Sequence, residues 1–408
     1  MLPKSFPKIW LTLSSLMLVS SHVVFAAQDP RVFIPDFDHN MIRTVNLVNP
    51  GFGAITLGIT APWARGMVAT PNGKYSFVAN GLGSTVISRI PNNDNNPMPT
   101  QITLGFAPYD MEVSADSKLL FIGANQRLIV VDVETLAMRL FSLGSIPGIP
   151  DANGQPQGTL IFNVTNSAIG IAPDMSSLYV HAQNIAAPNT NVVIVFKDVA
   201  QFMDGTRNIN SYWRATLPSS FANPPHLLFA RDGQRAFVGA SNGAYVIDAV
   251  NRAVIAGSNV TFPTPILDLQ IMPNGNYVYA GAYESAKVFK LHSQTLALMG
   301  TIPLYNAAAG EWDYYYRIRG VAFRADNSKL FASVETRSGS FSPNSFVRTV
   351  NLPDGGGLQS IDAFASGLIG RGEVVEALAG PDVTPPQFSN PLVALGNVGI
   401  FSDPTNAV

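Results

Sequence analysis

The sequence of 408 residues contains no cysteine. This absence excludes disulfide bonds, thiolate metal sites, cysteine nucleophiles and a bacterial lipid-attachment cysteine. Charged residues are also scarce, at 13% of the chain, and the formal net charge is −2. Because binding to phosphate backbones requires an excess of basic residues, we expect no nucleic-acid partner.

Signals for metal binding and for nucleophilic catalysis are weak. The few histidines lie far apart and lack metal-binding spacings, and neither a G-x-S-x-G motif nor a phosphate-binding loop is present. Asp36, Asp38 and Asn40 resemble the beginning of a calcium loop, because alternate side-chain oxygens can converge on a cation. The glycine and the distal glutamate of that loop are missing, so a polar loop is the simpler interpretation. We expect neither a metal nor a cofactor.

The first 26 residues have the features of a secretory signal peptide. Lys4 and Lys8 precede a short apolar stretch, and small residues occupy the −3 and −1 positions of a cleavage site after Ala26. A membrane anchor is the alternative, but the apolar stretch is short and interrupted by serines. The sequence therefore predicts a periplasmic or secreted protein of residues 27–408, with no membrane insertion after cleavage.

A repeated segment organises the rest of the chain. Residues 271–282, IMPNGNYVYAGA, contain a strand end, a tight turn and an alternating strand. Related segments occur at 69–80, 113–124, 171–182, 229–240 and 323–334. The turn positions 72, 116, 174, 232, 274 and 326 are separated by 44, 58, 58, 42 and 52 residues. Such spacings are typical of four-stranded propeller blades, the longer ones carrying loop insertions.

These units predict an all-β fold, a seven-bladed β-propeller of four-stranded antiparallel blades. Six units are complete, and the N-terminal unit lacks its innermost strand, which residues 372–379 can supply from the other end. Sharing one blade between the termini closes the ring and removes open sheet edges. A ring of six or of eight blades is an alternative, because the insertion at 144–166 can contain a hairpin that the repeat pattern does not reveal. The propeller is expected over 27–380, followed by a proline-rich tail at 381–408.

The sequence pattern of the repeat resembles that of the YVTN family of β-propeller repeats. The segments ATPNGKYSFVAN at 69–80 and IMPNGNYVYAGA at 271–282 are the nearest to the family pattern. The resemblance covers nearly all of the predicted mature chain and implies kinship with lactonase-like and quinoprotein amine dehydrogenase-like propellers. It implies a fold and no single activity, because such propellers include enzymes, redox subunits and binding proteins.

Candidate site residues come from aligning the units on their turns. The residues six and seven positions before each turn are expected at one mouth of the channel, together with the first residues of the closing strand. Their charged members and one histidine are Arg65, Asp110, His226, Asp268, Arg319, Arg371 and Glu373. Such a ring could bind an anionic or polyhydroxylated ligand. The simpler interpretation is that a channel mouth is hydrated and needs no ligand.

An aromatic stretch precedes one innermost strand and is expected on the same side of the ring. Trp312, Tyr314 and Tyr315 lie there between acidic residues and arginines. Aromatic rings in this setting can stack on a sugar or anchor a protein partner. The alternative, slightly favoured, is that they pack the loop against the neighbouring blade.

The sequence favours a non-catalytic, monomeric binding module for a protein partner or a small polar ligand. A lactonase-like hydrolase is one alternative, with His226 as base and Arg65 or Arg319 as the clamp for a carboxylate or oxyanion. An accessory subunit of a periplasmic redox complex is another, and its cofactor would have to lie in a second chain, because this one lacks a haem-attachment motif.

Overall fold

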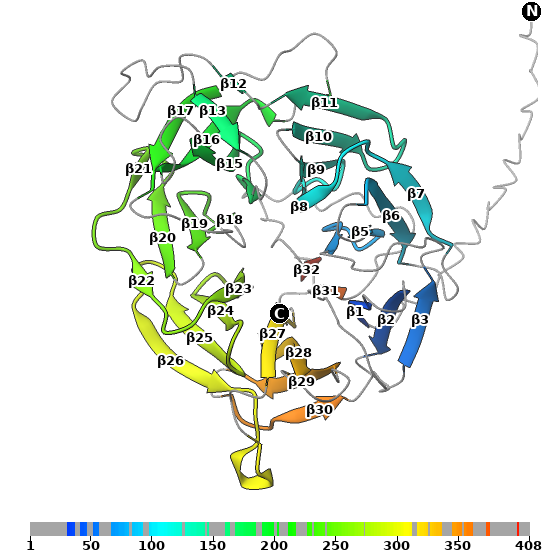
Figure 1. Ribbon diagram of the computed structural model, residues 1–408, viewed down its shortest axis with the longest axis vertical. Coiled ribbons are helices and arrows are strands. Elements are labelled where there is room, and N and C mark those ends of the chain that lie inside the picture. Colours follow the sequence, from blue (N-terminus) through cyan, green and yellow to red (C-terminus); the bar gives the residue numbers. More distant parts are fainter. Residues whose placement is uncertain are drawn as a thin grey trace, which may run out of the picture.

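The computed structural model shows an all-β chain whose sheets stand in a ring (Figure 1). This arrangement is a β-propeller. The structure describes residues 31–36, 41–46, 52–56, 67–80, 84–92, 98–124, 127–142, 145–146, 160–163, 168–184, 190–199, 202–203, 211–217, 227–230, 232–240, 243–272, 274–311, 316–324, 327–336, 345–352, 355–361, 373–375 and 398–399.

Six antiparallel sheets, the first to sixth blades, are each built from one continuous segment. The first two contain β4 (Met67–Ala69), β5 (Tyr75–Ala79), β6 (Val86–Pro91) and β7 (Thr100–Thr103), then β8 (Pro108–Val113), β9 (Leu119–Ala124), β10 (Arg127–Asp132) and β11 (Met138–Ser142). The third contains β12 (Ser145–Ile146), β13 (Leu160–Asn163), β14 (Ile169–Ile171), β15 (Ser177–Asn184), β16 (Thr190–Lys197) and β17 (Ser211–Thr216). The fourth contains β18 (Leu227–Phe229), β19 (Arg235–Ala240), β20 (Gly243–Asp248), β21 (Ala253–Val254) and β22 (Val260–Thr261). The last two contain β23 (Ile266–Ile271), β24 (Tyr277–Ala282), β25 (Lys287–His292) and β26 (Leu298–Pro303), then β27 (Tyr316–Phe323), β28 (Lys329–Thr336), β29 (Ser345–Asn351) and β30 (Gln359–Ile361), with a short 3₁₀ helix η2 (Ala307–Ala309) between them.

The insertion at 144–166 does contain a hairpin, but it makes no additional blade. β12 pairs with β13, and β13 pairs with the far end of β15, beside β14. The insertion therefore extends the inner edge of the third blade.

The two ends of the chain meet in one further sheet. It contains β1 (Arg31–Asp36), β2 (Met41–Asn46), β3 (Phe52–Thr56), β31 (Glu373–Val375) and β32 (Val398–Gly399). β31 lies within the predicted closing segment 372–379 and pairs antiparallel with β1, whereas β32 pairs parallel with β31. The prediction of a β-propeller with four-stranded antiparallel blades is therefore confirmed, whereas the predicted number of seven blades is wrong. The structure has six blades, and the sheet that joins the ends has five strands and a parallel pair, because the tail adds β32 at its inner edge.

The hairpin between the first and second strands has the same turn in all six blades. In each turn the amide of the fourth residue donates to the carbonyl oxygen of the first, and the fourth residue has a positive φ of 59° to 75°. These fourth residues are Gly73, Ser117, Met175, Gly233, Gly275 and Asn327. Aspartate or asparagine lies just before the fourth residue, and in five blades its side chain is seen to accept the amide two residues further on. Local chemistry thus fixes each turn.

Gly275→Ala should lower the free energy of unfolding by about 1 kcal/mol, because a β-carbon disfavours the left-handed backbone that this turn requires. Gly300→Ala in β26 is the matched control, since its added methyl group meets no atom within 4 Å and its φ is not in the left-handed range. The control should change stability by less than about 0.5 kcal/mol. Urea denaturation of both variants tests this, and equal effects would contradict the assignment of the turn.

The hydrophobic core lies between adjacent blades. In the contact between the fifth and sixth blades, Tyr279 of β24 and Phe323 of β27 are buried with their ring centroids 5.0 Å apart. Both faces of a middle strand pack against neighbouring blades, and all six residues of β9 are buried. Each blade therefore depends on its neighbours for burial, as in other radial repeats.

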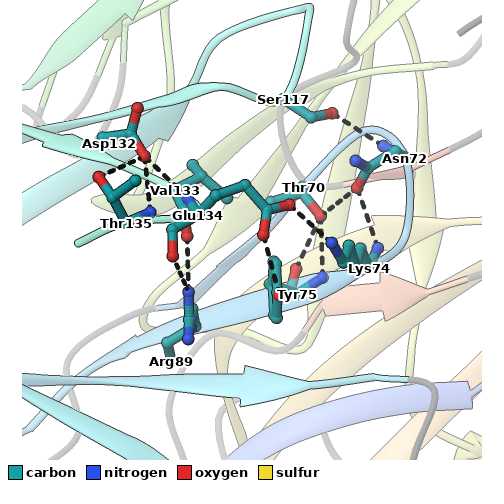
Figure 2. Close-up of polar contacts among 10 residues, drawn as sticks. All are labelled: Thr70, Asn72, Lys74, Tyr75, Arg89, Ser117, Asp132, Val133, Glu134 and Thr135. Carbon is teal, nitrogen blue, oxygen red and sulfur yellow. Dashed lines mark hydrogen bonds and ion pairs between the residues drawn. The ribbon is translucent and has the colours of Figure 1, made fainter. Parts of the chain in front are cut away.

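Polar contacts join the blades on the side of the ring that carries the tight turns, the turn face (Figure 2). The Asn72 amide in the first blade donates to Ser117 Oγ in the second at 3.0 Å, and the Asn274 amide donates to Asn327 Oδ1 in the equivalent place at 2.9 Å. Arg89 Nη1 donates to the carbonyl oxygens of Val133 and Glu134. The turn face is thus fastened by backbone groups together with short and long polar side chains.

Within the described part of the chain, no helix is both long and apolar enough to cross a membrane. The predicted signal peptide at 1–26 and most of the tail at 381–408 lie outside the described residues. The signal peptide, its cleavage and the limits of the mature domain therefore stay predictions.

Candidate functional site

The side of the ring opposite the turn face, here called the loop face, carries the loops that lead into the innermost strands. Three of the predicted site residues, Asp110, Asp268 and Arg319, are described there with their surroundings. Glu373 lies in β31, but its side chain is not described. The remaining predicted site residues lie outside the described residues: Arg65, His226, Trp312, Tyr314, Tyr315 and Arg371.

A β-bulge recurs on the innermost strands at this face. In the second, fifth and sixth blades one extra residue interrupts the pairing of the first strand with the second. The extra residues are Tyr109, Leu267 and Arg319. All three lie seven positions before their turns, so the bulge is a feature of the repeat. The residue type at the bulge differs from blade to blade. A bulge of this kind redirects a side chain, which suits the position to a site.

Each of the two described aspartates holds the next blade in place. Asp268 of β23 is fully buried, and its Oδ2 accepts the Val321 amide of β27 at 2.6 Å while its Oδ1 accepts Gln270 Nε2. Asp110 of β8 makes the equivalent contact, its Oδ2 accepting the Ile169 amide of β14 at 2.9 Å. The same carboxylate position therefore connects the second blade to the third and the fifth to the sixth.

Close packing brings that amide within reach of Asp268. Gly281 of β24 lies opposite Asp268, and a β-carbon there would come within 2.9 Å of Ile318 and 3.1 Å of Val321 in the next blade. Only a residue without a side chain allows β27 to approach this closely. The carboxylate contact and the glycine together set the distance between the two blades.

Arg319 belongs to a cluster of four residues, the arginine cluster, where the fifth and sixth blades meet. Arg319 Nε and Nη2 donate to Glu335 Oε2 and Oε1 at 2.7 and 2.8 Å. Arg317, directly opposite Glu335 in the sheet, has its Nη1 3.6 Å from Glu335 Oε1. The Tyr283 ring of the fifth blade lies 5.0 Å from the Arg317 guanidinium and 5.3 Å from that of Arg319. Two cations thus share one carboxylate beneath an aromatic ring.

Burial in the arginine cluster is uneven. The Glu335 side chain is 3% exposed, whereas those of Arg317 and Arg319 are 28% and 21% exposed. The carboxylate is therefore beyond the reach of a ligand, whereas parts of both arginine side chains are open to solvent. A surface of this kind attracts anions and offers them hydrogen-bond donors.

Position in the repeat could have revealed Tyr283 and Glu335 from the sequence. Both lie nine positions after the turns at 274 and 326, so they are equivalent residues of adjacent blades. The positions before the turn, from which the candidate site residues come, do not include them. Arg317 lies two residues before Arg319 on the same strand, and both approach Glu335.

A second ion pair anchors the loop that leads into β27. Glu311 Oε1 accepts Arg348 Nη2 of β29 at 2.7 Å, and its Oε2 accepts the Asn306 amide at 2.6 Å. Burial alone would raise the pKa of the Glu311 carboxyl, but the hydrogen bonds from Asn306 and Arg348 hold that pKa below its ordinary value of 4.5. Burial raises the pKa of the neighbouring Tyr316 phenol, and the Glu311 charge raises it further. Trp312, Tyr314 and Tyr315 lie outside the described residues, so their packing against the neighbouring blade stays a prediction.

The Glu311 contact predicts an acid-sensitive contribution to stability. A carboxyl whose pKa is lowered by folding stabilises the folded state above its unfolded pKa, and that contribution is lost as the pH falls through the folded pKa. Glu311→Gln should therefore be less stable than wild type at neutral pH, and the difference should shrink as the pH falls below 4.5. Urea denaturation of both proteins between about pH 3 and pH 7 tests this. A difference that does not vary with pH would contradict it.

Metal binding finds no support among the residues in view. No group of three or more histidine, aspartate or glutamate side chains that could hold a metal ion occurs in the described part of the chain. Asp36 ends β1, but its side chain is not described, and Asp38 and Asn40 lie outside the described residues. The weak calcium-loop candidate therefore stays untested.

Comparison with known proteins shows the fold. No family model matches the chain, and no curated protein matches it in sequence. A functionally unknown protein from Desulfotomaculum acetoxidans has a similar structure, with a TM-score of 0.57, 14% identity and coverage of 86% of this chain and 99% of that one. A putative 6-phosphogluconolactonase from Bacteroides fragilis has a TM-score of 0.57 and 13% identity, with coverage of 85% of this chain and 98% of that one. Dihydro-heme d1 dehydrogenase NirN in complex with DHE has a TM-score of 0.54 and 13% identity, with coverage of 88% of this chain and 78% of that one. These neighbours are β-propellers, and at such identities the likeness establishes the fold alone, so membership of the YVTN family stays a prediction.

Proposed function

We propose that this chain is an exported β-propeller that binds a small polar ligand or a protein partner on its loop face and does not itself catalyse a reaction. Export follows from the predicted signal peptide. The proposal rests on the hydrogen bonds of three described carboxylates on this face. Asp110 and Asp268 accept hydrogen bonds from backbone amides of the next blade, and Glu335 accepts hydrogen bonds from Arg319. Groups engaged in this way are poorly placed for proton transfer, whereas the Arg317 and Arg319 side chains beside Glu335 remain partly exposed.

A lactonase-like hydrolase is the principal rival. The fold likeness to the Bacteroides protein keeps it in consideration, and in that hypothesis His226 acts as base while Arg65 or Arg319 holds the substrate. Arg319 already donates two hydrogen bonds to Glu335, which argues against its use as a substrate clamp. An accessory redox subunit is a third hypothesis, and it predicts a cofactor-bearing partner chain.

Thermal unfolding with a ligand panel tests the proposal. The purified protein and an Arg65→Ala/His226→Ala/Arg319→Ala variant would be heated with sugars, sugar acids, sugar lactones and divalent cations. A ligand at a hundred times its dissociation constant stabilises the folded state by about 2.7 kcal/mol. We expect a shift for the wild type that the variant lacks, without turnover of any lactone. Hydrolysis of a lactone by the wild type that is lost in His226→Ala would overturn the non-catalytic assignment.

A further inference from the structure

We propose that the arginine cluster is a binding subsite for the carboxylate group of a small-molecule ligand, with Arg317 as its principal donor. The inference rests on the proposed function, because it names the chemistry that the loop face would recognise. The contact of the fifth and sixth blades creates this site, since Tyr283 comes from one and the two arginines from the other.

Charge is the first argument. Arg317 and Arg319 bring two positive charges to the single negative charge of Glu335, so the cluster has one excess positive charge. Glu335 is buried and cannot be approached, whereas both arginine side chains are partly exposed. One excess charge matches a single carboxylate, which would balance the cluster on its solvent side.

The unequal hydrogen bonding of the two arginines is the second argument. Arg319 is held by two short hydrogen bonds to Glu335. Arg317 approaches the same carboxylate only to 3.6 Å, which is too long for a hydrogen bond. Its Nε is buried and has no hydrogen-bond partner among the described residues. Arg317 thus keeps hydrogen-bonding capacity that Glu335 does not use. Because its Nε is itself buried, a ligand carboxylate would meet the Nη groups, whose parallel N–H groups fit its two oxygens.

The aromatic ring is the third argument. Tyr283 lies within 5.3 Å of both guanidinium groups, a distance at which a ring attracts a cation and restricts its orientation. The bulge at Arg319 and the Glu335 contact fix the other side of the cluster. Arg317 is therefore held in place before a ligand arrives, and little side-chain freedom would be lost on binding.

Isothermal titration calorimetry with D-galacturonate tests the site, and D-galactose is the uncharged counterpart. We expect D-galacturonate to bind the purified protein at least tenfold more tightly than D-galactose. Arg317→Gln should weaken D-galacturonate binding roughly ten- to a hundredfold, because a charge-assisted contact is lost. Arg317→Lys should keep part of the affinity, since the charge remains and the paired donors do not. Arg139→Gln, on the outermost strand of the second blade, is the matched control and should bind as wild type does.

The outcomes separate this inference from the proposed function. Equal affinity for D-galacturonate and D-galactose, or wild-type binding by Arg317→Gln, would overturn the carboxylate subsite while leaving a binding face in place. Absence of binding by D-galacturonate, when other compounds of the panel do bind, would also overturn it. If neither a compound nor a protein partner binds the loop face, the proposed function fails as well. Melting temperatures of the variants within a few degrees of wild type establish that they are folded.

Discussion

Asp268→Ala should lower the free energy of unfolding by about 3 kcal/mol. The substitution leaves the Val321 amide and the Gln270 side chain without their acceptor in a fully buried place, and each unsatisfied group costs about 1–3 kcal/mol. It also removes the bond between the fifth and sixth blades. Urea denaturation of the variant and the wild type gives the difference directly.

Two related variants sharpen this test. Asp268→Asn keeps one oxygen that can accept the Val321 amide, so it should be milder than the alanine variant. Asp110→Ala removes the equivalent contact with Ile169 at a partly exposed position and should cost about 1–2 kcal/mol. An Asp268→Ala variant as stable as the wild type would show that this carboxylate does not stabilise the contact between the fifth and sixth blades.

Glu335→Ala should lower the free energy of unfolding by about 2–3 kcal/mol. Removing one partner of a buried ion pair costs about 3–5 kcal/mol when the remaining charge stays buried. Here Arg317 and Arg319 are 28% and 21% exposed, so water relieves part of that cost. Denaturation curves of Glu335→Ala, Arg319→Ala and the double variant measure the coupling between the two residues.

The double variant provides the control for this second prediction. Once Arg319 is absent, removing Glu335 should cost clearly less than it does in the wild type, because only the long contact with Arg317 remains. Strictly additive effects of the two substitutions would show that the pair is not coupled and that the arginine cluster is not held together as described.

The repeated hairpin could be predicted from the sequence because its cause is local. Six turns carry Asp or Asn followed by a residue with positive φ, and these residues favour that turn wherever the chain places them. The mixed sheet at the ends could be predicted only in part. Residues 372–379 have the pattern of a strand, whereas β32 comes from a tail with no repeat to identify it.

The site was harder to predict for a different reason. Asp110 and Asp268 occupy equivalent positions of the repeat. The sequence pattern is the same for a carboxylate that binds a ligand and for one that accepts a hydrogen bond from an amide of the next blade. The distinction depends on the distance between blades, which Gly281 helps to set. Tyr283 and Glu335 are 52 residues apart and meet the same arginines only because their blades are adjacent.

The central claim is that acidic residues of the loop face hold adjacent blades together, while the arginine cluster binds the ligand. A crystal structure of the protein soaked with D-galacturonate tests this claim most directly. We predict that the ligand carboxylate lies against the Arg317 guanidinium beside Tyr283, with Asp268 still accepting the Val321 amide. A ligand bound to Asp110 or Asp268, with the contact to the next blade broken, would contradict the account.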